Sequence, residues 1–415
     1  MARPVALVLC GGMGERMRPW SERRPKTLLG LADGTETLFS RHVRELASRG
    51  FAVCANPQPM WARAHRDEAR SAGARLRLLP QTTPPKDSGT VIAELARTLR
   101  PETPIVVVYG DVWFPTGWYE RARDVAHLVA QGEHAVAVAA GLLPSGEPRR
   151  GMLRLDSDPG RNHCARMLAV SEDGGDAKAR HHSTGMVIVR AGAVPSIRGD
   201  LARDFLPRLV HHGMLAFGVA DDVGSQVDCG DLARYAGLCV REYLDNFGIE
   251  RYRGEDGAAE SLILRANKIR ICGNGGSLAI AMHAAQDWAK LGRVNARALT
   301  DLSLLTAYAN DVDYARAFSC QFLTDPLASG ACLVLFSGSG TSPNIAEAAR
   351  AGKVSGASVV LVTSSDGGKG TVADIVVRAP WPTRRMQECE DFFGAWSHAV
   401  ARVMTGLSPW DRVDA

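Results

Sequence analysis

The 415-residue sequence lacks the patterns that would point to a membrane, a secretory route or a disulfide framework. Its apolar runs, such as residues 105–109 and 331–336, are strand-sized and far shorter than the ~20 residues of a membrane-spanning helix. No charged region followed by an apolar core precedes Val5, so we expect a cytoplasmic location and no membrane partner. The nine cysteines occur singly, without the C-x-x-C spacing of zinc sites, so we expect buried, reduced thiols.

Charge and length set the broad class of the protein. Lysine and arginine together number 49 against 45 acidic residues, and the net charge of +4 is too small to indicate a nucleic-acid partner. Most basic residues are arginine, which we attribute to genomic base composition. The 46% of apolar and 23% of charged residues are typical of globular proteins. The length exceeds what one hydrophobic core usually serves, which predicts two domains.

Strand-like and helix-like segments alternate along both halves of the sequence. This alternation is typical of α/β domains with a doubly wound parallel sheet. A polar stretch without strand signal separates the halves, so we place the boundary near residues 252–258, between domains at 1–250 and 259–415. The predicted strands are residues 5–10, 75–79, 105–109 and 135–140 in the first half, and residues 268–272, 331–337, 358–363 and 375–379 in the second.

A glycine loop, GGMGERMRP, follows the first predicted strand. Gly11, Gly12 and Gly14 allow backbone N–H groups to close on phosphate oxygens, where a Cβ would clash or forbid the required φ. Arg16 and Lys26 supply cations that neutralise a polyphosphate as a leaving group develops. A glycine loop alone is a weak signal, whereas G-G-x-G-x-R followed by P-K is a specific one.

Together with later motifs, this stretch resembles the signature of sugar-1-phosphate nucleotidyltransferases, which join an NTP to a sugar 1-phosphate and release pyrophosphate. The resemblance covers roughly residues 4–245 and implies a Rossmann-like fold. It also implies that small residues of the DSGT segment contact the base and ribose of the nucleotide, and that Gly185 in HSTGMVIVR lies at the sugar-binding position. The DSGT residues concerned are Ser88, Gly89 and Thr90.

Two aspartates complete this candidate site. Asp111 ends the apolar strand VVVYGDV, and Asp228 precedes a predicted helix in SQVDCGDLARY. The resemblance makes both residues ligands of Mg²⁺, and two carboxylates at strand ends form the hard-oxygen site that this ion prefers. The ion would draw charge off the α-phosphate while the sugar phosphate attacks in line, without a covalent enzyme intermediate. The alternative is that both aspartates are only helix N-caps.

One position departs from the pattern of the family. Many members carry a lysine in an E-K-P triplet that contacts the sugar phosphate, and here Asp173 stands in its place. Either Lys178 or Arg180 substitutes for that lysine, or the sugar phosphate is held differently. The departure therefore concerns the sugar side of the site and leaves the nucleotide side unaffected.

A second glycine loop, CGNGGSLAIAMHAAQDWAK, opens the second half. With FSGSGTSPN and VTSSDGGKG it resembles the SIS (sugar isomerase) family, nearest to sedoheptulose 7-phosphate isomerase, which implies a flavodoxin-like parallel sheet flanked by helices. The hydroxyl and N–H groups of these loops lie at predicted helix N-termini, where the helix dipole favours an anion such as a sugar phosphate. Any one loop also fits a serine-rich turn that caps a helix. The candidate phosphosugar ligands are Asn274, Ser277, Ser337, Ser339, Thr341 and Ser342.

The residues that this resemblance assigns to isomerisation are only partly present. Phosphoheptose isomerases gather zinc with a His, a Glu four residues later, a Gln, and a second His eight residues after the Gln. Here His283 and Gln387 match, Asp287 replaces the Glu, and Ala395 stands at the second His position. Arg384 replaces the family's Asp three residues before the Gln. The pattern predicts a domain that still binds a phosphosugar but is impaired in isomerisation.

His398 is the only histidine near the vacant ligand position. It lies eleven residues after Gln387, on nearly the same helix face but about 4.5 Å further along the axis than residue 395. We therefore expect His398 to be a structural residue rather than a substitute ligand. Zn²⁺ binding by a remnant of His283, Asp287, Gln387 and His398 stays an open alternative.

The leading interpretation is a Mg²⁺-dependent sugar-1-phosphate nucleotidyltransferase fused to an SIS domain that is impaired in isomerisation. The fusion suggests a heptose 1-phosphate, because the two activities belong to one route to activated heptoses. One alternative is a bifunctional enzyme that also isomerises sedoheptulose 7-phosphate, with Asp287 as base and Glu390, Asp391 or His398 completing the site. Another is an SIS domain that senses a phosphosugar and adjusts the transferase. We expect a homo-oligomer formed through the SIS domain, and the NTP and subunit number stay open.

Overall fold

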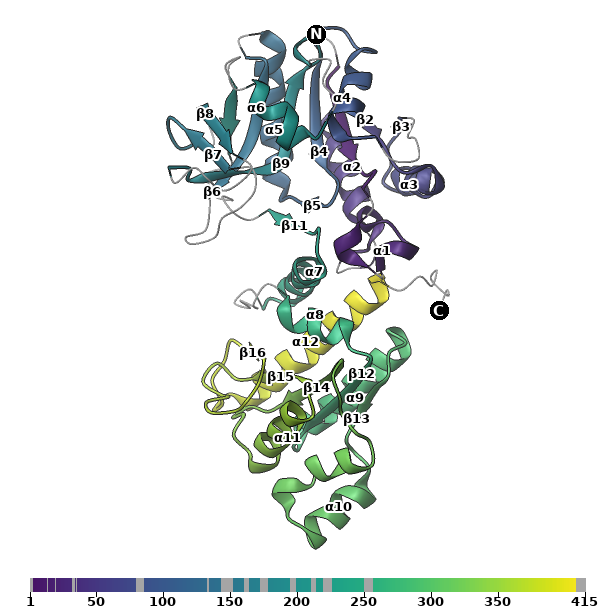
Figure 1. Cartoon of the computed structure of the whole chain (residues 1–415), viewed down its shortest axis with the longest axis vertical. Helices are drawn as coiled ribbons and strands as arrows, with labels where there is room; N and C mark the ends of the chain where they lie inside the picture. The colour runs from purple at the N-terminus through teal and green to yellow at the C-terminus, as the bar shows by residue number, and fades with distance from the viewer. Residues whose placement is uncertain are drawn as a thin grey trace. The chain divides into compact units, whose positions relative to one another are not determined.

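The computed structural model describes two compact units (Figure 1). The first comprises Met1–Leu29 and Glu36–Gly230, and the second comprises Gly30–Thr35 and Asp231–Ala415. The predicted domain boundary near residues 252–258 lies largely outside the described residues and stays a prediction. Described are residues 3–12, 14–18, 20–31, 34, 36–79, 86–132, 134–142, 152–159, 164–171, 178–194, 199–209, 214–218, 226–249 and 257–407.

The first unit is built on a nine-stranded sheet in the order β3-β2-β1-β4-β9-β6-β10-β8-β7. The predicted α/β class is confirmed, but this sheet is mixed, because β9 pairs antiparallel with both β4 and β6. The strands are β1 (Val5–Leu9), β2 (Ala52–Ala55), β3 (Leu76–Leu78), β4 (Pro104–Tyr109), β6 (Val136–Leu142), β7 (Met152–Leu155), β8 (Ala165–Ser171), β9 (His181–Arg190) and β10 (Leu215–Phe217). A separate ladder joins β5 (Val112–Trp113) to β11 (Val227–Asp228). The helices are α1 (Trp20–Arg23), α2 (Leu38–Ser48), α3 (Ala62–Ser71), α4 (Ser88–Ala96), α5 (Thr116–Gln131) and α6 (Leu206–Leu209).

Burial on both faces explains why the central strands of this sheet are continuous apolar runs. Ala6 and Val8 of β1 lie in one buried apolar cluster, whereas Val5 and Leu7 lie in another. Successive side chains of a strand point to opposite faces, so each face of the sheet has its own core. β1 lies between parallel strands β2 and β4, and the strand order reverses at the β1–β4 pair. Ligands of such sheets bind outside the carboxyl ends of the strands at this reversal.

The second unit has a five-stranded, wholly parallel sheet in the order β13-β12-β14-β15-β16. Counted along the chain this order is 2-1-3-4-5, so the predicted flavodoxin-like topology is confirmed. Its reversal lies between β12 and β14, where the second glycine loop and the serine loop emerge. The strands are β12 (Lys268–Gly273), β13 (Ala296–Ala298), β14 (Ala331–Phe336), β15 (Ser358–Thr363) and β16 (Ile375–Arg378). The helices are α7 (Leu232–Asn246), α8 (Ala258–Arg265), α9 (Gly276–Leu291), α10 (Leu302–Asp311), α11 (Pro343–Val354) and α12 (Met386–Leu407).

Helices α9 and α12 pack side by side and run in the same direction. The Trp288 indole of α9 donates to the carbonyl of Ser397 at 3.0 Å, and its ring meets Trp396 edge to face at 6.4 Å. The Trp396 indole donates to Glu260 of α8 at 2.7 Å. This buried aromatic contact fixes the register between the two helices, and with it the residues of α12 that face α9.

Two expectations on composition can be compared with the structure. All nine cysteines are free and most are buried, as predicted. Among the helices of the described ranges, none combines the length and apolarity that a bilayer crossing requires.

Candidate functional site

The first glycine loop leaves β1 and turns sharply at Gly14. Its φ of +65° lies in the left-handed region, and an added Cβ would lie 2.9 Å from that of Ser21. The Ser21 hydroxyl donates to the carbonyl of Gly14 at 2.7 Å, which holds the turn. The space above Gly12 is open, since an added Cβ there would meet no atom within 4 Å. The loop therefore presents accessible backbone at the edge where β1 ends, as a phosphate loop requires.

Lys26 and Asp111 form an ion pair at this edge. Lys26 begins a single 3-10 turn, Lys26–Leu28, and Asp111 follows β4, so the contact joins segments 85 residues apart. Both side chains are mostly buried. An ammonium group against this carboxylate shows that the position stabilises a cation.

The turn that carries Lys26 is anchored by a buried histidine on α3. His65 bonds through Nε2 to the Thr27 hydroxyl at 3.1 Å and through Nδ1 to the carbonyl of Trp61 at 2.9 Å. A carbonyl only accepts, so Nδ1 carries the proton and Nε2 accepts from Thr27. Burial lowers the pKa of His65 to about 4, and the bond to Trp61 opposes this shift only in part.

His65 should make the first unit less stable in acid. Its pKa is lower in the folded than in the unfolded chain, so the unfolded chain binds the extra proton, and stability is lost as the pH falls from about 6.5 towards 4. The loss is about 3 kcal/mol at most. We expect His65→Gln to flatten the dependence of the denaturant midpoint on pH. The exposed His127, changed to glutamine as a control, should leave the wild-type slope; equal slopes in all three proteins would refute the assignment.

Asp111 and Asp228 are brought together by the β5–β11 ladder. Asp228 pairs with Val112 in this ladder, and the N–H of Cys229 donates to the carbonyl of Asp111 at 2.8 Å. The alternative that both aspartates are helix N-caps is wrong, because Pro115 caps α5 and Asp231 caps α7. The backbones at Asp111 and Asp228 thus lie side by side at strand ends beside the glycine loop, and carboxylates at such positions are the ligands that a hard divalent cation prefers.

The side chain of Arg16, which follows the glycine loop, lies next to Gly230 and Asp228. A Cβ added to Gly230 would lie 2.5 Å from Arg16 Nη2 and 2.7 Å from Asp228 Oδ1. Asp228 Oδ1 also accepts from the N–H of Gly230 at 2.8 Å. The absence of a side chain at Gly230 therefore lets the guanidinium approach the second carboxylate.

Substitution of Gly230 by alanine should disturb this approach without removing any functional group. The new methyl group would displace the Arg16 guanidinium, the Asp228 carboxylate or both. We expect pyrophosphate release to fall roughly tenfold to a hundredfold, because misplacement by about 1 Å costs that much in positioned reactions. Gly394 within α12 of the second unit, where an added Cβ meets no atom within 4 Å and the backbone is helical, offers a control substitution to alanine. An unchanged rate in Gly230→Ala would refute the close approach.

The predicted nucleotide-binding residues of the DSGT segment hold α4 to a neighbouring loop. The Ser88 hydroxyl accepts from the N–H of Leu201 at 2.7 Å, and the N–H of Gly89 donates to Gly199 at 2.9 Å. The Thr90 hydroxyl donates to Asp87 at 2.9 Å. These groups therefore have structural roles in the described protein, and their contact with a nucleotide stays a prediction.

Of the residues predicted for the sugar side of the site, Gly185 lies next to the segment that carries Asp111. Gly185 on β9 has a φ of +92°, and an added Cβ would lie 3.1 Å from both Tyr109 and Val112. These two residues stand shortly before and directly after Asp111 in the sequence. Lys178 and Arg180 are exposed. Asp173 lies outside the described residues.

His42 is a residue of this region that the sequence did not reveal. It is fully buried on α2, and its Nδ1 bonds to the Tyr119 hydroxyl at 2.8 Å. Burial and then the charge of Arg41 lower its pKa to about 4, whereas Asp111 acts in the opposite direction. The only sequence signal is a polar residue on the apolar face of a predicted helix.

The second glycine loop joins β12 to α9. Gly275, with a φ of +55°, precedes the helix, and Ser277 in its first turn is only 3% exposed. Asn274 and Asn344 exchange two amide hydrogen bonds of 2.9 and 2.8 Å, which tie this loop to the start of α11. The two predicted phosphosugar loops are therefore neighbours at one edge of the sheet.

The serine loop after β14 supplies the remaining predicted ligands. Ser337 accepts from the N–H of Gly340 at 3.1 Å, and Ser339 accepts from the N–H of Thr341 at 3.2 Å. Ser342 stands at the N-cap position of α11, but its side chain makes no capping hydrogen bond. The alternative of a purely capping turn is therefore wrong for Ser342.

His283, Asp287 and His398 form a cluster between α9 and α12. The two imidazole Nε2 atoms are 2.8 Å apart, and Asp287 Oδ2 lies 3.5 Å from His283 and 3.8 Å from His398. One ligand atom from each residue lies within 4.8 Å of the others, as a metal site requires. Burial, followed by the charge of His283, lowers the pKa of His398.

This cluster places His398 beside His283, although its position along α12 led us to expect a structural residue rather than a substitute ligand. The expectation took residue 395 as the position of α12 that faces His283, whereas the packing of Trp288 and Trp396 sets a register in which residue 398 does. Gln387 is exposed in the first turn of α12. Eleven residues of helix separate it from His398, or about 16 Å.

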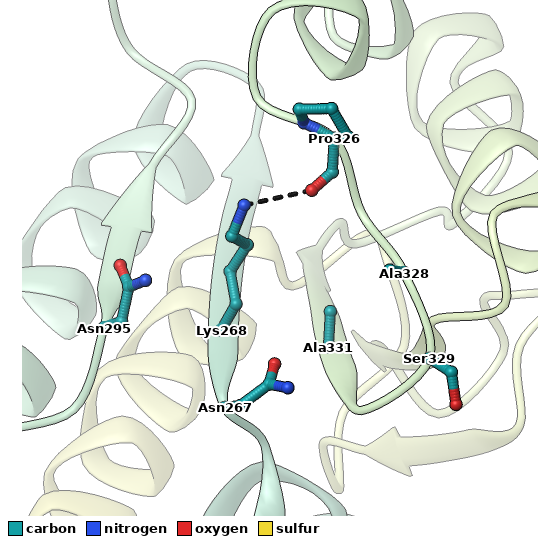
Figure 2. A pocket seen from close by; sticks show the side chains of 7 residues that line it. All are labelled: Asn267, Lys268, Asn295, Pro326, Ala328, Ser329 and Ala331. Atoms are coloured by element: carbon teal, nitrogen blue, oxygen red, sulfur yellow. Dashed lines mark hydrogen bonds between the residues drawn. The ribbon is translucent and has the colours of Figure 1, made fainter.

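A separate hollow of about 330 Å³ lies at the amino-terminal edge of the second sheet. Figure 2 shows Lys268 at its centre, pointing to the carbonyl of Pro326. Lys268 also pairs with Asp325 at 2.8 Å, a carboxylate that it shares with Arg270. The hollow is a strand's length away from the glycine and serine loops, at the end of β12 where ligands of such sheets do not usually bind. It is lined by Asn267, Lys268, Asn295, Pro326, Ala328, Ser329 and Ala331.

Comparison with protein families finds one match in each half of the chain. Residues 6–148 match the MobA-like NTP transferase domain, and residues 258–364 match the SIS domain. Both matches confirm the families predicted for the two halves. The predicted fusion of an NTP transferase domain with an SIS domain is therefore correct.

Individual relatives agree with this division. The phosphoheptose isomerase of Aliarcobacter butzleri is 35% identical over 155 residues, which are 35% of this chain and 79% of that protein. The phosphoheptose isomerase of Coxiella burnetii is 40% identical over 138 residues, 30% of this chain and 68% of that protein. Among solved structures, a UTP-bound UGPase from Acinetobacter baumannii matches with a TM-score of 0.50 and 16% identity, over 63% of this chain and 99% of that one. At this identity the last match shows the fold alone.

Proposed function

Through its second unit the chain belongs to the phosphoheptose isomerase family of SIS domains, and because an NTP transferase domain precedes that unit, we propose that the protein is a sugar-1-phosphate nucleotidyltransferase. It would transfer a nucleotidyl group from an NTP to a sugar 1-phosphate and release pyrophosphate. The observation that carries the proposal is the meeting of the glycine loop, Arg16, Lys26 and two carboxylates at the β1–β4 edge.

The residues of this edge have distinct roles in the proposed reaction. The open backbone at Gly12 and the Arg16 guanidinium bind phosphate oxygens of the NTP. Asp111 and Asp228 fit a Mg²⁺ ion, because hard carboxylate oxygens are the ligands that it prefers. When bound, the ion would neutralise negative charge on the phosphate oxygens. Lys26 is positioned to leave Asp111 and neutralise the developing pyrophosphate, while the oxygen of the sugar phosphate attacks in line.

A heptose 1-phosphate is the proposed acceptor. Its support is the fusion itself, because the relatives of the second unit are named phosphoheptose isomerases. The test is pyrophosphate release, with Mg²⁺, across a matrix of common NTPs and sugar 1-phosphates that includes heptose 1-phosphates. We expect one strong pairing with a heptose. A preference for a hexose 1-phosphate would refute the proposed heptose substrate. The absence of pyrophosphate release with every pair would contradict nucleotidyl transfer. The cytoplasmic location and homo-oligomeric state stay predictions.

The cluster on α9 and α12 favours a second function for the SIS domain. Two imidazoles and a carboxylate with one side open fit a catalytic Zn²⁺ site of three protein ligands. Residues that bind the metal are not free to act as the base, so a carboxylate outside the metal ligands would have to move the proton between adjacent carbons of the phosphosugar, and Glu390 and Asp391 are the candidates. We propose that the cluster binds a transition metal and supports isomerisation of a ketose phosphate such as sedoheptulose 7-phosphate. Loss of that conversion in Asp287→Asn would be expected, and an unchanged conversion would refute it.

A further inference from the structure

The carboxylate of Glu390 lies against the first turn of α9, where the SIS domain would bind phosphate. A Cβ added to Gly276 would lie 2.7 Å from the Cδ of Glu390, so a side chain at that position and this carboxylate exclude each other. The Ser277 hydroxyl, itself almost completely buried, donates to Glu390 Oε1 at 3.4 Å. Glu390 thus occupies the helix end that would otherwise be open to an anion.

Among the described residues, no basic side chain forms an ion pair with Glu390. Arg385, which immediately precedes α12, pairs with Glu388 at 2.7 Å. Within residues 257–407, all of which are described, none of the ion pairs involves Glu390. Its compensation comes from the Ser277 hydroxyl and the positive end of the α9 dipole. These are the groups that a phosphate would use.

We propose that Glu390 competes with the phosphate group of the ligand for the N-terminus of α9 and thereby sets the selectivity of this loop. The inference rests on the proposed binding of a phosphosugar by the SIS domain. Like charges a few ångströms apart repel strongly inside a protein, so a phosphate dianion enters only when the carboxylate swings away. Free phosphate gains little to offset that movement, whereas a phosphosugar gains further contacts from its carbon chain. The loop therefore discriminates against free phosphate.

The test compares the full-length wild type with Glu390→Gln and with Glu388→Gln as a matched control. The control removes the same charge from the same helix, two residues away. Binding of inorganic phosphate and of sedoheptulose 7-phosphate is measured by calorimetry. Phosphate binding by the first unit is common to all three proteins, because both substitutions lie in the second.

We expect Glu390→Gln to bind inorganic phosphate about tenfold more tightly than the wild type, with a smaller gain for the sugar phosphate and no change in Glu388→Gln. An unchanged or weaker affinity in Glu390→Gln would overturn the proposal, and so would an equal gain in the control. Failure of all three proteins to bind sedoheptulose 7-phosphate, with the expected gain for inorganic phosphate retained, would contradict the phosphosugar function alone. If neither inorganic phosphate nor sedoheptulose 7-phosphate bound to any of the three proteins, both the role of Glu390 and the phosphosugar function would be refuted.

Discussion

Replacement of Asp111 by asparagine is expected to reduce pyrophosphate release by roughly a thousandfold. The substitution keeps the shape of the side chain but removes the charge that pairs with Lys26 and that suits a divalent cation. Asp228→Asn should have an effect of the same order, although its amide oxygen can still accept from the N–H of Gly230. The measurement is the steady-state rate of pyrophosphate release at saturating Mg²⁺, on the NTP and sugar pairing that the wild type prefers.

The control for this pair is Asp124→Asn on α5. Asp124 is an exposed carboxylate of the same unit that pairs with its neighbour Arg123, so its loss should leave the rate unchanged. Far-ultraviolet circular dichroism should be the same in all variants, because the substitutions remove no core volume. If both Asp111→Asn and Asp228→Asn retained wild-type rates, the two-carboxylate site would be wrong.

The sequence predicts those residues of the first site that directly follow buried strands. The apolar runs before Gly11 and Asp111 predict the parallel strands β1 and β4, and parallel strands bring their carboxyl ends to one edge. The antiparallel half of the sheet was not predicted. Strands β7 to β10 are short or pair with residues far away in the chain, so no local alternation distinguishes their direction.

Side-chain contacts between segments that are distant in the sequence could not be predicted either. The local pattern does not indicate that His42 bonds to Tyr119, or that the hydroxyls of Ser88 and Thr90 are used within the protein. These contacts depend on tertiary packing between segments tens of residues apart. The residue types predicted for the nucleotide side are therefore present, but their availability to a ligand could not be judged from spacing alone.

The register of two packed helices explains why the position of His398 beside His283 was not predicted. Helical periodicity placed His398 on the correct face of α12, but the meeting point with α9 was taken from the family pattern. In the structure the contact between Trp288 and Trp396 fixes which turn of α12 lies opposite His283. Axial register between helices comes from the sizes of the interdigitating side chains, and no sequence period encodes it.

Removal of His398 should abolish metal binding by the SIS domain, and removal of Gln387 should not. We expect His398→Ala to weaken the binding of Zn²⁺ or Co²⁺ at least a hundredfold, since it leaves one imidazole and one carboxylate. Gln387→Ala is the matched control, because Gln387 occupies a ligand position of the family pattern but is exposed in the first turn of α12. Calorimetry measures the affinity, and the visible absorption of bound Co²⁺ reports its coordination.

The pH dependence of this binding gives an independent check. Because burial lowers the pKa of His398, its imidazole stays neutral and able to bind a metal at pH values below the ordinary range of histidine. Protonation of His398 should therefore begin to weaken metal binding only at a pH below the ordinary titration range of histidine. If Gln387→Ala lost the metal while His398→Ala kept it, the ligands would be those of the family pattern, and the site between α9 and α12 would have to be assigned differently.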